Sequence, residues 1–275
     1  PVRGKLDFCD VCFAYPTQKG CDDDSDDTAV LEQVSFCVQP NTVLALVGES
    51  GSGKSTIAKL ALRLYDPTSG SIKLDGVDIR QLDLVEYHKS VCIVSQNPIL
   101  LGGTIADNIS FGAWADKSCD TKERRSAIQE AARKACAHEF IEKLPHGYDT
   151  VLGGTATAEG ATKLSGGQKA RIAIARALFI QPAVCILDEA TANLDSNLEA
   201  GVMDGVAALK AETACSVLII AHRLATFRSA DSIVVLDGAG HIVEQGTHDS
   251  LLSQSSSSLD PNSGFYANLV QRQLL

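Results

Sequence analysis

The stretch from Gly48 to Thr56 reads GESGSGKST and carries the clearest chemistry in the sequence. It fits the spacing Gly-x-x-x-x-Gly-Lys-Ser, in which glycines let the backbone pass close to phosphate oxygens. A short apolar run, Thr42 to Val47, precedes the loop, and a helix-forming run, Ile57 to Leu64, follows it. The helix start adds N–H donors and the positive end of a dipole. The sequence therefore predicts a site for the phosphates of a nucleotide.

Two side chains of this loop have separate tasks. Lys54 can reach the β- and γ-phosphates, and Ser55 can offer its hydroxyl to Mg²⁺. Backbone N–H groups along the loop supply further donors. The predicted ligand-binding residues of the loop are Gly48, Glu49, Ser50, Gly51, Ser52, Gly53, Lys54, Ser55 and Thr56. A glycine-rich turn that matches by chance is the alternative, and the strand before the loop and the helix after it argue against that alternative.

Polar residues of the kind used in phosphate chemistry follow three further apolar runs, each of which reads as a buried strand. They are Gln96 after Val91 to Ser95, Asp188 and Glu189 after Val184 to Leu187, and His222 after Val217 to Ala221. Ligands of parallel α/β sheets bind beyond the carboxyl ends of the strands. One Gln or His there could be an ordinary strand end facing solvent. Four such ends, with the phosphate loop included, favour a common site.

Each of these side chains suits one task in the transfer of a phosphoryl group to water. Asp188 can hold Mg²⁺ through water, and Glu189 can polarise the attacking water, because adjacent residues leaving a strand point in different directions. Gln96 can sense both the metal and the water, and His222 can hydrogen-bond the γ-phosphate. The predicted catalytic residues are Glu189, His222, Gln96 and Lys54, and the predicted metal-binding residues are Ser55, Gln96 and Asp188.

The run Leu164 to Gln168, LSGGQ, indicates a second anion site. Ser165 followed three positions later by Gln168 forms a capping box, which is the purely structural alternative. Two glycines in the first turn of a helix each cost about 1 kcal/mol relative to alanine, and a cap does not require them. They favour the close approach of a ligand to a helix start that attracts anions. The predicted ligand-binding residues here are Ser165, Gly166, Gly167 and Gln168.

The elements that must position these residues alternate between strands and helices. Lys5 to Tyr15 and Leu31 to Val38 read as strands, and strand-like runs recur at Ile72 to Leu74 and Ile233 to Leu236. A polar insert, Pro16 to Thr28, has no apolar anchor and reads as a solvated loop. A calcium-binding loop is excluded for this insert because the required Gly and Glu spacing is missing.

Between Gln96 and Pro182 the strand signal gives way to helical periodicity, for example at Ser126 to Ala137 and Gly166 to Phe179. This arrangement predicts an α/β core with an inserted helical subdomain. The predicted organisation is a single nucleotide-binding domain over 1–275. It has an α/β core with an N-terminal β-subdomain at 1–95 and 182–252, a helical subdomain at 96–181, and a flexible Ser-rich segment with an amphipathic tail at 253–275.

Composition and charge exclude several other classes of protein. Hydrophobic residues make up 45% and charged residues 21% of 275, which is typical of a globular chain. The net charge of −10 argues against a general nucleic-acid binder. No apolar run reaches the roughly 18 residues that would span a bilayer. The chain starts at Pro1 and its only methionine is Met203, so we expect a piece of a longer or processed protein.

The nine cysteines show no regular spacing, which favours reduced thiols over a disulfide framework. Cys9 and Cys12 have the spacing of a metal or redox pair. They lie in a strand-like segment, where residues three apart point to opposite faces, so they form a poor clamp.

Together these motifs resemble the nucleotide-binding domain of ABC transporters over nearly the whole chain. The matching motifs, in family order, are Tyr15 as the aromatic platform, the Walker A loop Gly48 to Thr56, Gln96 of the Q-loop, the signature Leu164 to Gln168, Walker B ending in Asp188 and Glu189, the D-loop Ala192 to Asp195, and His222 of the switch. Gly103 to Ile105 with Asn108 and Ile109, and the run Leu144 to Thr150, resemble the exporter branch that includes multidrug and peptide transporters.

The resemblance implies a P-loop NTPase core, with a mostly parallel sheet, an antiparallel β-subdomain and an inserted α-helical subdomain. It implies that two such domains meet head to tail, so that each ATP, with Mg²⁺, lies between the Walker motifs of one and the signature of the other. Tyr15 would stack on adenine, and Asp195 would belong to the nucleotide-binding set. The implied partners are a second nucleotide-binding domain, as a homodimer or pseudo-dimer, and the transmembrane domains of the same transporter, with no nucleic acid.

The implied function is ATP binding and hydrolysis that power a membrane exporter, with closure on ATP and reopening after hydrolysis. The domain would be soluble itself and membrane-associated through its transporter, on the cytosolic or organelle-matrix face. A non-transport ABC ATPase acting on a soluble macromolecule is the alternative; the sequence lacks the long coiled coil of chromosome-type members and the second cassette of translation-type members. A regulatory domain without turnover is disfavoured by Glu189 and His222.

The sequence departs from the family pattern in three places. The segment Gly153 to Lys163 before the signature is longer than usual, with Glu159 as the nearest candidate for its acidic residue. The D-loop carries Ala192 and Asn193 where Ser-Ala is usual, and the acidic insert after Tyr15 is also long.

Overall fold

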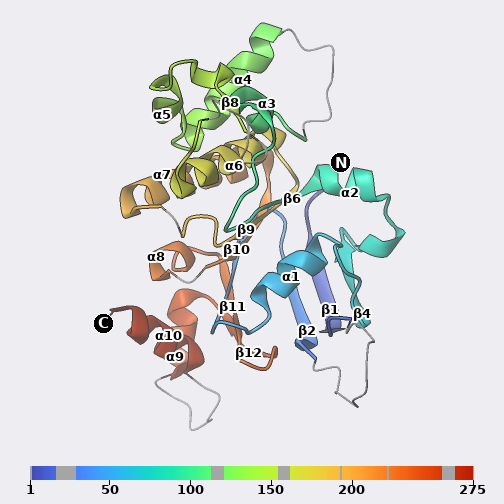
Figure 1. Cartoon of the computed structure of the whole chain (residues 1–275). Coiled ribbons are helices and arrows are strands. Elements are labelled where there is room, and N and C mark those ends of the chain that lie inside the picture. Colours follow the sequence, from blue (N-terminus) through green and yellow to red (C-terminus); the bar gives the residue numbers. More distant parts are fainter. Residues whose placement is uncertain are drawn as a thin grey trace, which may run out of the picture. The chain divides into compact units, whose positions relative to one another are not determined.

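The computed structural model describes residues 2–16, 29–112, 121–153, 162–192, 194–221, 223–255 and 264–274. These residues form two compact units (Figure 1): the first comprises Pro1–Tyr87 with Ser216–Leu275, and the second comprises His88–Cys215. Several features singled out in the sequence lie outside the described residues. They are the aspartate run of the polar insert, Glu159, Asn193, His222 and most of the Ser-rich segment.

An antiparallel sheet opens the first unit, with the strand order β2-β1-β4-β5. Its strands are β1 (Leu6–Phe13), β2 (Leu31–Val38), β4 (Ser69–Leu74) and β5 (Val77–Asp78). Leu6 and Phe8 of β1 are buried, and so are Val11 and Phe13; an irregularity in the register between Phe8 and Val11 shifts the period of two by one residue. Phe8 lies opposite Phe36 of β2, and their rings stack with centroids 4.5 Å apart. This sheet is the antiparallel β-subdomain expected from the family resemblance.

The other strands of the first unit are mainly parallel. β3 (Val43–Gly48) lies between β10 (Ser216–Ile220) and β11 (Ser232–Leu236), and β12 (Ile242–Gly246) pairs antiparallel with β11. The apolar runs that predicted these strands are almost completely buried, as strands covered on both faces must be. Since β3 and β10 are parallel, their carboxyl ends lie at the same edge, where the phosphate loop begins.

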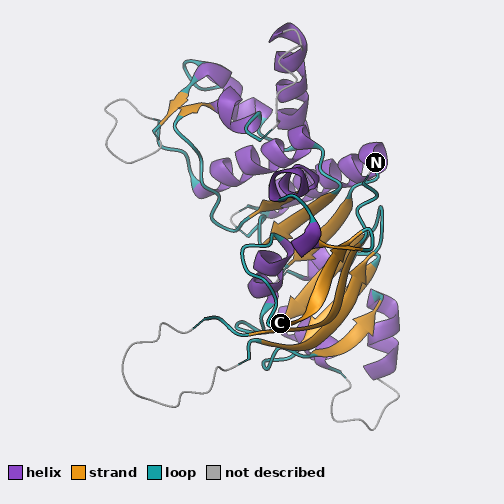
Figure 2. Cartoon of the chain, turned by 90° about the vertical axis from the view of Figure 1, so that its right-hand side faces the viewer, coloured by secondary structure: helices purple, strands orange, loops and turns teal. Residues whose placement is uncertain are grey.

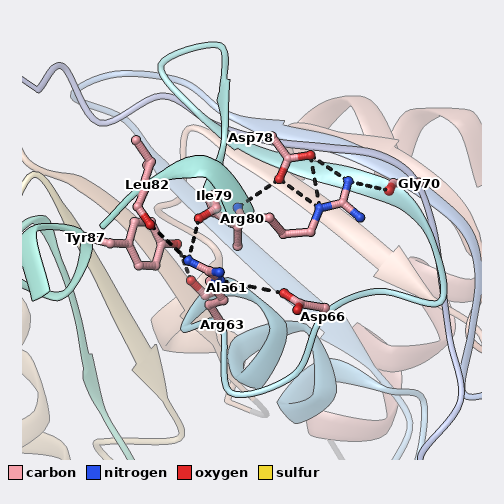
Figure 3. A network of polar contacts seen from close by, with 9 residues as sticks. All are labelled: Ala61, Arg63, Asp66, Gly70, Asp78, Ile79, Arg80, Leu82 and Tyr87. Carbon is pink, nitrogen blue, oxygen red and sulfur yellow. Dashed lines mark hydrogen bonds and ion pairs between the residues drawn. The ribbon is translucent and has the colours of Figure 1, made fainter. Parts of the chain in front are cut away.

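Helix α1 (Lys54–Ala61) follows the phosphate loop, and its far end is fixed by a polar network (Figure 3). Arg63 adopts a left-handed backbone conformation, with φ of +54°, that turns the chain at the end of the helix. Its guanidinium donates hydrogen bonds of 3.0 Å to the carbonyl oxygens of Ile79 and Leu82. The hydroxyl of Tyr87 donates to the carbonyl oxygen of Ala61. The network ties α1 to the 3₁₀ turn η1 (Ile79–Gln81) and to α2 (Leu84–Ser90).

The remaining helices of the first unit are α8 (Leu224–Phe227), α9 (His248–Ser255) and α10 (Phe265–Leu274). The amphipathic tail predicted from the sequence is α10, which buries Tyr266 and Val270. The hydroxyl of Tyr266 lies 2.7 Å from His248 Nδ1, which connects α10 to α9. Among the residues that the structure describes, no helix is both long and apolar enough to cross a membrane.

The second unit is mostly helical, with a parallel pair of strands, β6 (Val91–Val94) and β9 (Val184–Asp188). Its helices, which Figure 2 shows in purple gathered against one another, are α3 (Ile105–Ile109), α4 (Thr121–Lys134), α5 (His138–Glu142), α6 (Gly166–Ile180) and α7 (Ser196–Thr213), with the 3₁₀ turn η2 (Gly147–Asp149). Helix α6 packs on α3, α4 and α7 and is apolar over most of its surface, which explains its long buried run.

The stretch from Gln96 to Pro182, where the sequence shows helical periodicity and no strand signal, also contains short strands. Two two-residue strands, β7 (Gly103–Thr104) and β8 (Val151–Leu152), pair antiparallel within the helical part. A pair this short leaves no alternation in the sequence, because each strand forms only through contact with a segment nearly fifty residues away. The cysteines of the described residues, Cys9 and Cys12 included, are not joined in disulfides.

Candidate active site

The phosphate loop needs glycine at particular positions. Gly53 forms the N-cap of α1 with φ of +90°, and Gly51 has φ of +86°, so both lie in the left-handed region. A Cβ atom on Gly53 would lie 2.5 Å from Leu31 Cδ2, and one on Gly48 would lie 2.6 Å from the carbonyl oxygen of Leu236. The loop is therefore wound too tightly for side chains at these points, which fits a backbone cradle for phosphate.

Lys54 lies buried inside this cradle, with 5% of its surface exposed. Its Nζ donates hydrogen bonds to the carbonyl oxygens of Gly48, at 3.1 Å, and Glu49, at 2.7 Å, and to Ser52 Oγ, at 3.1 Å. A buried ammonium requires such oxygen partners. The loop thus holds a positive charge at the place where the sequence predicts the β- and γ-phosphates. Ser55, the predicted metal ligand, follows at the exposed face of the first turn of α1.

Tyr15, the predicted aromatic platform, follows β1 and contacts α1. Its hydroxyl lies 3.1 Å from Thr56 Oγ1, the last residue of the phosphate loop, and Lys59 Nζ donates to the phenol oxygen at 3.2 Å. The structure therefore brings the predicted base-binding and phosphate-binding residues together within the first unit. Lys59 had no signal in the sequence, since a lysine on a helix surface is ordinarily solvated.

In the second unit, the structure brings Gln96 and Glu189 together. Gln96 Nε2 donates a hydrogen bond of 2.7 Å to Glu189 Oε2. The contact arises because β6 and β9 are parallel neighbours, with Val94 opposite Leu187, so that the residues after each strand meet at one edge. This is the convergence expected from the sequence for these two strand ends. Asp188 is the last residue of β9 and is half-buried.

Glu189 also has an unusual backbone. Its φ of +49° lies in the left-handed region, which residues with a side chain seldom adopt. The chain turns there, with Ala192 N donating to the carbonyl oxygen of Glu189 at 3.0 Å. Non-glycine residues in such conformations cluster at active sites. Spacing alone could not reveal this conformation, which Arg63 at the end of α1 also adopts.

Ser165 begins α6 with the capping box expected from its spacing to Gln168. Ser165 Oγ accepts from the Gln168 backbone N at 3.2 Å, and Gln168 Oε1 accepts from the Ser165 backbone N at 2.9 Å. Ser165 and Gly166 are exposed. The helix start therefore presents a serine hydroxyl and the positive end of a 15-residue helix at the surface of the unit.

Helix α6 is fixed by two arginines that the sequence analysis missed. Arg176 Nε donates 2.8 Å to the carbonyl oxygen of Asn108, and its Nη2 donates 3.0 Å to Asn108 Oδ1. Asn108 Nδ2 in turn donates 2.9 Å to the carbonyl oxygen of Leu101. Arg171 Nη1 donates 2.7 Å to the carbonyl oxygen of Cys136. The hydrogen bonds of Arg176 to Asn108 tie the segment after Gln96 to α6. Burial lowers the pKa of both guanidinium groups from the usual value.

Asp195 has a structural task as the N-cap of α7. Its Oδ1 accepts from the backbone N of Asn197, at 3.1 Å, and of Leu198, at 3.0 Å. An Asp directly before a helical run is a recognisable capping signal that the sequence analysis did not use. The assignment of Asp195 to the nucleotide-binding set stays a prediction.

The predicted site residues thus fall into two groups, each formed within its own unit. Tyr15 and the phosphate loop belong to the first unit. The second unit contains Gln96, Asp188, Glu189 and the start of α6 at Ser165 and Gly166, which we call the Ser165 corner. A further contact of the loop came from the end of the chain, where Arg272 Nη1 of α10 lies 2.8 Å from Glu49 Oε1. That the two groups act on one nucleotide stays a prediction.

No cluster of three or more His, Cys, Asp or Glu side chains suited to a metal ion occurs in the part of the chain that the structure describes. Such a cluster is not required for the predicted Mg²⁺ site, because its ligands are a hydroxyl, an amide and one carboxylate. Mg²⁺ keeps several waters and takes phosphate oxygens beside one or two carboxylates. The hydroxyl of Ser55, exposed at the start of α1 beside the Lys54 cradle, fits this chemistry.

Comparisons with known proteins agree with these motifs. The family model described as ABC transporter matches residues 31–192. The ABC multidrug transporter atrC of Emericella nidulans is 44% identical over 278 residues, which cover 100% of this chain and 20% of that protein. The mitochondrial potassium channel ATP-binding subunit of Homo sapiens is 44% identical over 275 residues, which cover 100% of this chain and 33% of that protein. This chain therefore spans about a fifth to a third of these two relatives.

Among solved structures, a bacterial Atm1-family ABC exporter with ATP bound is similar, with a TM-score of 0.82 and 36% identity. The match covers 99% of this chain and 42% of that chain. The α/β fold expected from the sequence, a P-loop NTPase core with an inserted helical subdomain, is confirmed by this likeness. The chain belongs to the ABC transporter family.

Proposed function

We propose that this chain binds ATP with Mg²⁺ and hydrolyses it as one half of a head-to-tail pair of such domains, and that the cycle drives export through transmembrane domains. The observation that carries the proposal is the buried ammonium of Lys54, held by three oxygens within the glycine loop. A cradle of this kind has a preformed positive centre for a triphosphate. Arriving phosphate oxygens can exchange with the carbonyl oxygens that now accept from Nζ.

The binding residues of the first unit have separate tasks. Lys54 and the loop N–H groups donate to phosphate oxygens, and the dipole of α1 adds to the attraction. Tyr15 offers its ring to adenine, a stacking contact worth about 1–3 kcal/mol by analogy with other base–aromatic pairs. Ser55 and Asp188 would hold Mg²⁺, which when bound neutralises charge on the phosphates.

Glu189 and Gln96 would act on the water that attacks the γ-phosphate. Glu189 would accept the proton of that water, and Gln96 holds the carboxylate in place through the 2.7 Å hydrogen bond. His222 would hydrogen-bond the γ-phosphate. The exposed Ser165 corner would bind the triphosphate of the partner domain, as a helix start with a hydroxyl suits an anion.

The relatives support transport over the alternative of an ATPase acting on chromosomes or ribosomes. Those reported above are named as a transporter, a channel subunit and an exporter. The chain matches only part of each, so the membrane partner and the substrate it moves belong to the proposal. We place the chain at a membrane through that partner, on the cytosolic or organelle-matrix side.

The pairing can be tested by the dependence of ATPase rate on protein concentration. If two copies must share each ATP, the rate of the purified chain rises more than linearly with its concentration, up to saturation of the pair. A Ser165→Glu variant, which places negative charge where the triphosphate of the partner would bind, should lose this rise while keeping ATP affinity. A strictly linear rate would contradict the paired mechanism.

A further inference from the structure

The ring of Tyr15 is held at its phenol oxygen by two side chains of α1. Lys59 Nζ donates to this oxygen at 3.2 Å. Because an ammonium has no acceptor, the phenol can give its own hydrogen to Thr56 Oγ1, 3.1 Å away. Lys59 Nζ also lies 5.2 Å from the centroid of the Tyr15 ring, within the range of cation–π attraction.

Two aromatic neighbours fix the tilt of the same ring. Phe13 meets Tyr15 at a centroid distance of 4.9 Å and an interplanar angle of 82°, and Tyr65 meets it at 5.3 Å and 90°. Such edge-to-face pairs are favourable arrangements of aromatic rings. Tyr65 reaches this place because the chain turns at Arg63, whose guanidinium is fixed by two backbone carbonyls (Figure 3).

Helix α1 therefore contacts the predicted nucleotide site both where the phosphates and where the base are expected to bind. Thr56 closes the phosphate loop, is buried, and lies one turn before Lys59, so the two side chains share a face of α1. Both contact the phenol oxygen of Tyr15. The ring of Tyr15 is thus fixed to α1, the same helix that follows the phosphate loop.

We propose that Lys59 is a positioning residue for the base of the bound nucleotide, acting through Tyr15. The proposal rests on the function proposed above, in which Tyr15 stacks on adenine. A ring that is already oriented loses less conformational freedom when a base stacks on it, so binding is tighter. Lys59 lies outside the phosphate loop, and its effect should therefore depend on the presence of a base.

The test compares two ligands that share phosphates and differ in the base. Dissociation constants for ATP and for inorganic tripolyphosphate, each with Mg²⁺, are measured by calorimetry on the purified chain. Lys59→Met keeps the aliphatic stem and removes the donor, and we expect its Kd for ATP to rise about 3- to 10-fold while its Kd for tripolyphosphate stays constant. Lys59→Arg should restore ATP affinity, and Lys73→Met, on β4 of the same unit, is the matched control.

A double variant asks whether Lys59 acts through Tyr15. Tyr15→Phe keeps the ring and removes the oxygen that Lys59 and Thr56 hold. If the proposal holds, adding Lys59→Met to Tyr15→Phe raises the Kd for ATP little beyond the larger single effect, because both changes remove the same anchor. If the increases in the Kd for ATP caused by the two single changes multiply in the double variant, the proposal is wrong.

The outcomes separate this inference from the proposed function. If Tyr15→Ala leaves the Kd for ATP unchanged, Tyr15 does not stack on the base and that part of the proposed function fails. If Tyr15→Ala weakens ATP but Lys59→Met does not, only the role of Lys59 fails. An equal weakening of tripolyphosphate by Lys59→Met would show a general electrostatic effect and also overturn the inference. Circular dichroism of each variant checks that the fold is intact.

Discussion

The phosphate loop of the first unit and the turn at Glu189 in the second differ in how they are packed. The loop is tightly packed, since Lys54 is buried and a side chain on Gly48 or Gly53 would meet Leu236 or Leu31. At the turn, the exposed side chain of Gln96 donates a hydrogen bond to the Glu189 carboxylate, and the backbone of Glu189 is left-handed. A rigid cradle fits the phosphate binding that we propose for the loop.

The largest effect should come from Glu189→Gln. The amide has the shape of the carboxylate but cannot take a proton, so turnover should fall by about 10²- to 10⁴-fold, as for loss of a general base. The Kd for ATP should stay near that of the unchanged chain, and pairs of domains should accumulate with ATP in size-exclusion chromatography. Turnover close to normal would show that another residue activates the water. The turn at Glu189 would then have no catalytic role to set against the binding role of the phosphate loop.

Lys54→Met should act on binding. Loss of charge-assisted hydrogen bonds to phosphate, worth about 1.5–3 kcal/mol, should raise the Kd for ATP by about 10- to 100-fold in calorimetry. Lys73→Met is the control for loss of a positive charge elsewhere in the unit. If Lys54→Met bound ATP normally, the cradle would not be the phosphate site.

Two glycine variants test how tightly the loop is wound. Gly51→Ala meets open space and should lose only the cost of a left-handed residue, about 1–2 kcal/mol in the free energy of unfolding. Gly53→Ala has a similar φ and also meets Leu31 Cδ2 at 2.5 Å, so it should lose about 1 kcal/mol more. Urea unfolding followed by circular dichroism measures both. Equal decreases in the free energy of unfolding would show that the Leu31 side chain moves away at little cost and that the loop is less tightly packed than the structure indicates.

The smallest effect should come from Arg272→Ala, which removes the ion pair with Glu49. Both side chains are more than half exposed, and such pairs contribute about 0–1 kcal/mol. We expect a change in the Kd for ATP of less than about fivefold, present at low salt and absent at high salt because exposed charges are screened. A larger change that persists at high salt would show that α10 supports the cradle in another way.

Local spacing was enough to predict several features that the structure then confirmed. The phosphate loop lies between β3 and α1, Ser165 and Gln168 form a capping box, and the buried apolar runs form strands. Each of these depends on residues within a few positions of one another. The roles of the site residues in binding and catalysis stay predictions, and His222 lies outside the described residues.

Other features depend on contacts between distant parts of the chain. The pairing of β7 with β8, the anchoring of Arg176 on Asn108, and the approach of Arg272 to Glu49 join segments about 50 to more than 200 residues apart. Composition and periodicity carry no trace of such pairs. The left-handed turn at Glu189 was also invisible, because the spacing that located the residue contains no information about its φ.

The amino-acid sequence by itself predicted which residues carry chemistry, because a phosphate cradle and a helix cap are local patterns of residue types. Only the tertiary structure decided how those residues are held. It brought Gln96 to Glu189 and placed the hydroxyl of Tyr15 against Thr56 and Lys59 of α1. The physical reason is that burial and hydrogen-bond partners arise from packing, which neighbours in the chain do not specify.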